Sequence, residues 1–68
     1  MLLNSSFQDI YKDRVFVISF YTHNGGFTAK LKIHGLPERS YEGKTWASRE
    51  QAKSDVSNDA RSEIDALP

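Results

Sequence analysis

The sequence predicts an α+β domain of two layers, in which two helices cover one face of a three-stranded antiparallel sheet. Three observations predict it: a hairpin signal at Asn24-Gly25, a helix start at Ser48, and helical spacing of apolar residues near the N-terminus. The expected α-β-β-β-α order fills residues 1–68 as a single domain.

The hairpin is indicated by Asn24-Gly25, the dipeptide that most readily supplies two positive φ angles in a two-residue turn. If residues 23 and 26 flank the turn, the register of both strands follows, and apolar residues fall on one face only. The apolar face then pairs Phe16 with Ile33, Ile18 with Leu31 and Phe20 with Ala29, and the polar face pairs Val17 with Lys32, Ser19 with Lys30 and Tyr21 with Thr28.

A C-terminal helix is predicted from a capping box, Ser48 followed three residues later by Gln51. It carries a narrow apolar stripe of Ala52, Val56, Ala60, Ile64 and Leu67. Residues 39–45 are expected to form the third strand, with Gly43 facing inward so that the helix packs close to the sheet.

The first helix is predicted over about residues 5–12. Leu3, Phe7 and Ile10 lie at helical spacing, and Ser5 with Gln8 offers a second capping-box pattern. Only Asp13-Arg14 would then separate this helix from the first strand.

Composition restricts the classes of function that fit. Nine basic residues balance nine acidic ones, so no global field draws the chain to nucleic acid or lipid. Locally, residues 28–53 hold six cations against three carboxylates, net +3, and residues 54–68 are net −3. The chain has no cysteine, and no stretch is typical of a signal peptide or membrane helix, so an intracellular location is expected, with nucleus and cytoplasm not distinguished.

No pattern for catalysis or for a cofactor stands out. Gly43-Lys44-Thr45 is similar to the end of a P-loop, but position 38, where that motif needs glycine, is Glu38. His23 and His34 have no second ligand at metal-site spacing. We therefore expect a non-catalytic domain without metal or cofactor.

The order of elements, Tyr41-Glu42-Gly43 in the third strand, and Ala52-Lys53 in a capped helix together resemble the double-stranded RNA-binding domain. This resemblance implies a module that reads duplex shape through its first helix, its first hairpin loop and the start of its last helix. Phe7-Gln8-Asp9-Ile10 is similar to the family's Leu-Gln-Glu-Leu pattern. The RNA-binding residues it implies are Gln8, Asp9, His23, Asn24, Lys44, Arg49 and Lys53.

Glu50 stands where the family has a lysine between the matches at Arg49 and Lys53. Because each neutralised phosphate adds to affinity through counterion release, this reversal predicts weak binding of double-stranded RNA.

A protein-interaction or dimerisation module of the same fold is the first alternative. The balanced charge suits it, and a free edge of the third strand with Ser40 and Glu42 would accept a partner strand. Its exposed apolar candidates are Val17, Tyr21, Leu36 and Trp46.

A sheet-face DNA-binding domain is the second alternative. Gly26-Phe27-Thr28-Ala29 and Thr45-Trp46-Ala47-Ser48 are similar to segments of plant ethylene-response factors and integrase arms, which place a sheet face in the major groove. An N-terminal helix would have to stay off that face. The face would show Tyr21, Lys30, Lys32, His34 and Lys44.

Overall fold

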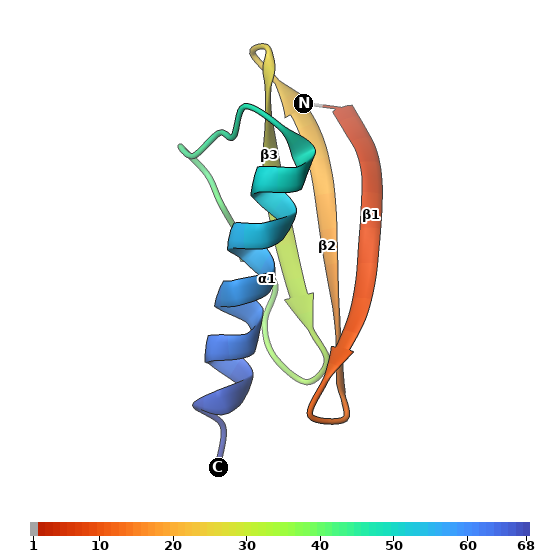
Figure 1. Ribbon diagram of the computed structural model, residues 1–68, viewed down its shortest axis with the longest axis vertical. Helices are drawn as coiled ribbons and strands as arrows, with labels where there is room; N and C mark the ends of the chain where they lie inside the picture. Colours follow the sequence, from red (N-terminus) through yellow and green to blue (C-terminus); the bar gives the residue numbers. More distant parts are fainter. Residues whose placement is uncertain (1) are drawn as a thin grey trace.

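The computed structural model describes residues 2–68, a four-stranded antiparallel sheet with one helix (Figure 1). The strands are β1 (Leu2–Tyr11), β2 (Arg14–His23), β3 (Gly26–Ile33) and β4 (Arg39–Ser40), in the spatial order β1-β2-β3-β4. Helix α1 (Arg49–Asp65) packs on one face of the sheet. Within the described residues, no helix is both long and apolar enough to cross a membrane.

The prediction of a three-stranded sheet with two helices is wrong, because the segment expected to form the first helix is strand β1. Lys12 and Asp13 have positive φ angles of 49° and 62°, so they make a two-residue turn that pairs Tyr11 with Arg14. A helix of about eight residues is marginal by itself. Pairing with β2 gives the same segment hydrogen-bond partners from Leu2 to Tyr11.

The predicted third strand is also shorter than expected, since only Arg39–Ser40 pairs with β3 as a ladder. Continuing that register would place Gly43 opposite Phe27, but Trp46 takes this place three residues later. Residues 41–45 therefore loop out between the two contacts. Gly43 lies in this loop with φ at 79° and open space around its Cα, so its predicted role in close helix packing is wrong.

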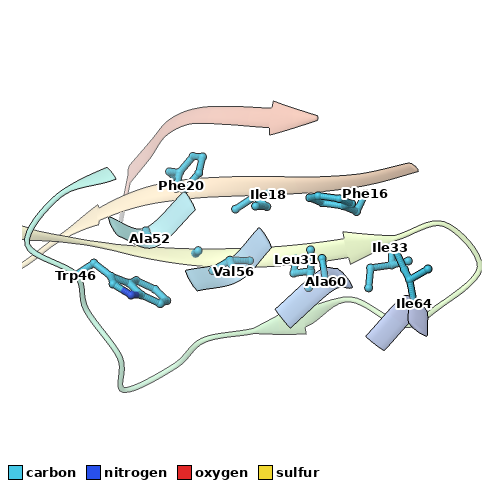
Figure 2. Close-up of a cluster of buried hydrophobic side chains, with 11 residues drawn as sticks. Phe16, Ile18, Phe20, Leu31, Ile33, Trp46, Ala52, Val56, Ala60 and Ile64 are labelled. Atoms are coloured by element: carbon cyan, nitrogen blue, oxygen red, sulfur yellow. The ribbon is translucent and has the colours of Figure 1, made fainter. Parts of the chain in front are cut away.

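The central hairpin forms in the predicted register, with all six predicted pairs present. Its apolar face packs against the predicted helix stripe, and Figure 2 shows these side chains meeting between β2, β3 and α1. Trp46 closes one end of this core and is 6% exposed. The buried cluster comprises Phe16, Ile18, Phe20, Ala29, Leu31, Ile33, Trp46, Ala52, Val56, Ala60 and Ile64.

Helix α1 begins where the sequence predicts. Ser48 has an extended backbone, and its Oγ accepts a hydrogen bond from the backbone N–H of Gln51 at 3.2 Å. Small side chains at Ala52 and Ala60 are fully buried against the sheet.

Candidate nucleic-acid interface

The face of the sheet turned away from α1, here called the outer face, carries no carboxylate on the three long strands described by the structure. Strand alternation and the pairing register decide which side chains it presents. They are Leu3, Ser6, Gln8 and Ile10 from β1, Val15, Val17, Ser19, Tyr21 and His23 from β2, and Thr28, Lys30 and Lys32 from β3.

The opposite side of the molecule is acidic. Helix α1 holds five carboxylates against three cations, a net charge of −2, so the remainder of this neutral chain is net +2. Arg39 at the sheet edge reaches two of the helix carboxylates, with its guanidinium 4.0 Å from Asp59 and 3.7 Å from Glu63. The fold thus separates charge, with acids on the helix and lysines on the outer face.

Tyr21 and Lys30 form a cation-aromatic pair on the outer face. The Lys30 Nζ lies 5.3 Å from the centroid of the Tyr21 ring, and both side chains are half-buried. Lys32 is exposed two residues further along β3, and its ammonium donates to the backbone carbonyl of Leu36. An aromatic ring beside two lysines can pack on a sugar or a thymine methyl group while the ammonium groups contact phosphate.

The loop of residues 41–45 borders a hollow of about 460 Å³ beside this pair. Lys44 at its rim lies with Nζ 5.4 Å from the Trp46 ring centroid, and Glu42 is the carboxylate that lines it. The lining also includes the Tyr21–Lys30 pair and the polar side chains of His23, Asn24, Thr28, Ser40 and Thr45. The full lining is Tyr21, His23, Asn24, Thr28, Ala29, Lys30, Ser40, Glu42, Gly43, Lys44 and Thr45.

Three residues predicted to bind RNA come together at this hollow, namely His23, Asn24 and Lys44. His23 Nε2 and Asn24 Nδ2 lie 3.3 Å apart. Gln8 also lies on the outer face, in a row with Val17 and Lys32 across β1, β2 and β3.

Arg49, Lys53 and Asp9 lie on the helix side of the sheet, apart from the hollow. Arg49 Nε donates to Ser5 Oγ at 2.7 Å, and its guanidinium carbon lies 4.7 Å from the Phe20 ring centroid. Lys53 Nζ lies 4.2 Å from the Phe7 ring centroid. Both cations rest on aromatic rings over β1 and β2, so they do not form one surface with His23, Asn24 and Lys44.

Tyr41 marks the boundary between the two sides. Its hydroxyl donates to Asp59 at 2.8 Å, and its backbone carbonyl accepts from the Thr28 hydroxyl at 3.1 Å. Burial and the bond to Asp59 raise the pKa of the Tyr41 phenol well above its usual value. Tyr41 is therefore a neutral structural donor that attaches the loop to α1.

No protein-family model, curated protein or solved structure matches this chain. The resemblance to the double-stranded RNA-binding domain thus rests on short motifs, and the first of its three contact regions is a strand here. Binding of RNA itself stays a prediction. Tyr21, Lys30 and Lys32 were not among the predicted RNA-binding residues. The hairpin register placed them together on the polar face of the sheet, and they were named only for the DNA-binding alternative. No group of three or more metal-ligating side chains occurs in residues 2–68.

Proposed function

We propose that this chain is a non-catalytic DNA-binding module that applies the outer face of the β2–β3 hairpin to the major groove. The observation that carries the proposal is the outer face itself, where Tyr21, Lys30 and Lys32 meet no strand carboxylate while the helix side is acidic. A duplex approaching this face meets cations first, and a duplex approaching the helix meets net negative charge.

The fold removes the main objection to this mode of binding. The N-terminal helix that would have had to avoid the reading face is an edge strand in the same sheet. No helix therefore lies over the outer face of the hairpin, and α1 is on the opposite side (Figure 1).

Groove geometry favours DNA over RNA for this surface. The major groove of B-DNA admits a two-stranded β-ribbon, whereas that of A-form RNA is too deep and narrow for side chains to read. Lys30 and Lys32 supply two cations on the outer face, so the logarithm of affinity is expected to fall with the logarithm of salt concentration with a slope of roughly −2.

The test is a titration of the chain with a labelled DNA duplex and an RNA duplex of the same sequence at several salt concentrations. Lys30→Gln/Lys32→Gln is expected to weaken DNA binding and to reduce the salt slope by about 2. Arg49→Gln/Lys53→Gln removes the same charge from the helix side and should leave DNA binding nearly unchanged. Preference for RNA that is lost in the second variant would overturn the proposal, as would binding to neither duplex.

A further inference from the structure

Strand β1 forms one edge of the sheet and has no strand beside it on its outer side among residues 2–68. It is ten residues long, and α1 lies over β2 and β3 rather than over it (Figures 1 and 2). Natural edge strands are usually shortened, covered, or protected by lysine or proline. Leu2–Tyr11 contains neither lysine nor proline, and its one charged residue is Asp9.

The exposed large apolar side chains gather on this edge. Leu2, Leu3 and Ile10 of β1 are 75%, 64% and 58% exposed, and Val15 beside Ile10 is 36% exposed. Burial of these residues against a further strand would remove an apolar surface that the single chain leaves in water.

The tight turn after β1 decides which of its backbone groups are free. Residues that flank a two-residue turn form a hydrogen-bonded pair, so Tyr11, Asp9, Phe7 and Ser5 direct their N–H and C=O groups toward β2. The alternate residues Ile10, Gln8 and Ser6 direct theirs outward, where the N–H of Ile10 donates to the Asp9 carboxylate at 2.8 Å. The outward groups of Gln8 and Ser6 are directed toward a further strand.

We propose that the partner of this edge is a second copy of the chain, paired antiparallel through β1 about a two-fold axis at Phe7. This register sets Ser6 opposite Gln8 of the second copy. The backbone N–H of each residue can then donate to the backbone C=O of the other. It also sets Ile10 next to the bulge at Asn4 of the second copy, where Leu3 lies on the same face. The strand is thus complementary to itself.

Charge complementarity supports the same register. Asp9 faces the helix side and would lie opposite Ser5 of the second copy, whose hydroxyl already accepts from Arg49 at 2.7 Å. Lys53 lies over Phe7, the residue on the axis itself. Each Asp9 carboxylate would therefore meet the two helix cations of the other copy, and this occurs twice about the axis.

The dimer is independent of the proposed DNA binding, and its test is association. The whole chain should sediment with the mass of two chains at high concentration and dissociate on dilution. Asp9→Lys places a cation against Arg49 and Lys53 and is expected to give monomer at all concentrations tested. Glu42→Lys makes the same charge change on an exposed loop at the opposite sheet edge and should leave the dimer intact.

Because the chain is free of cysteine, introduced cysteines report the register directly. Residues opposite each other in a hydrogen-bonded pair lie roughly 5.5 Å apart between Cα atoms, within disulfide range. A mixture of Ser6→Cys and Gln8→Cys chains should therefore cross-link as a heterodimer on oxidation, and each alone should link poorly. Ser6 and Gln8 are exposed, so neither change should disturb the fold.

Three results would overturn the proposal. The first is a monomeric chain at every concentration, which would show that β1 does not pair with a second copy. The second is efficient linking of Gln8→Cys alone, which would exclude the two-fold at Phe7. The third is linking of Ser19→Cys instead, since Ser19 lies on the outer face of β2 and would report stacking of two outer faces.

Discussion

Lys30 Nζ lies 5.3 Å from the centroid of the Tyr21 ring, and the two residues are diagonal neighbours across the β2–β3 ladder. The ring holds the ammonium group over the sheet, on the face opposite the carboxylates of α1. This pair is therefore the centre of the proposed contact surface.

Tyr21→Ala should weaken DNA binding about fivefold or more, because truncation of an aromatic residue at the centre of an interface costs more than about 1 kcal/mol. Tyr21→Phe keeps the ring and should retain most of the affinity. Fluorescence anisotropy at fixed salt measures both, and circular dichroism checks that the fold persists. Equal affinity for the alanine and phenylalanine variants would show that the ring makes no contact with DNA.

Asp55→Ala should destabilise the fold by about 1–2 kcal/mol, because it leaves the indole N–H of Trp46 without its acceptor. The Trp46 Nε1 donates to the Asp55 carboxylate at 2.7 Å, and Trp46 is 6% exposed. Urea unfolding followed by fluorescence reports this directly, since Trp46 is the only tryptophan. Glu42→Ala, a carboxylate deletion in the exposed loop, serves as the control and should change stability little.

Ser48→Ala should cost about 1 kcal/mol of stability, since the Ser48 side chain caps the first turn of α1. Ser54→Ala, in the body of the same helix on an exposed position, should be neutral or slightly stabilising because alanine is the better helix former. The two variants are compared by chemical denaturation. Equal effects would mean that the cap contributes nothing to folding.

Protonation of Asp65 should reduce the stability of the fold near the turn between β1 and β2. A hydrogen bond from Lys12 and one from the Tyr11 hydroxyl hold the pKa of the Asp65 carboxyl below its usual range. Its contribution to stability is present above the carboxyl's unfolded pKa and is lost as the pH falls through the lower folded value. NMR titration of the Asp65 carboxyl should show this low midpoint, and Lys12→Gln should raise it toward the ordinary value. An unchanged midpoint in Lys12→Gln would assign the shift to another group.

The central hairpin and the capped helix could be predicted because each is specified by local signals that agree with the apolar pattern. Asn24-Gly25 supplies the turn, and Ser48 supplies the cap. These signals do not depend on the rest of the chain.

The prediction of the first helix was wrong, and the strand at residues 39–45 is shorter than predicted, because both outcomes depend on partners distant in the sequence. Phe7 and Ile10 fit a helical spacing, but in a strand they lie on opposite faces, with Phe7 packed against the core and Ile10 exposed. Pairing with β2 selects the strand. The loop at residues 41–45 exists because Trp46 pairs with Phe27 and fills the end of the core. Neither relationship is visible in a local window.

Only part of the candidate site could be predicted, because its assembly also depends on contacts between segments distant in the sequence. His23, Asn24 and Lys44 come together because the predicted hairpin turn lies beside the loop of residues 41–45, which was not predicted. Arg49 and Lys53 were selected from a motif, but in the structure their side chains lie over the aromatic rings of Phe20 and Phe7 instead.

The most direct test of the proposed DNA interface is NMR mapping of backbone amide shifts on addition of a DNA duplex to the isotope-labelled chain. We expect the largest changes at the backbone amides of Tyr21, Thr28, Lys30, Lys32 and Lys44, with little change along α1. Lys30→Gln/Lys32→Gln should abolish the changes at the same DNA concentration, and Glu50→Lys, on the helix side, should not enlarge them. Shifts centred on Arg49 and Lys53, or no shifts at all, would show that the outer face does not bind DNA.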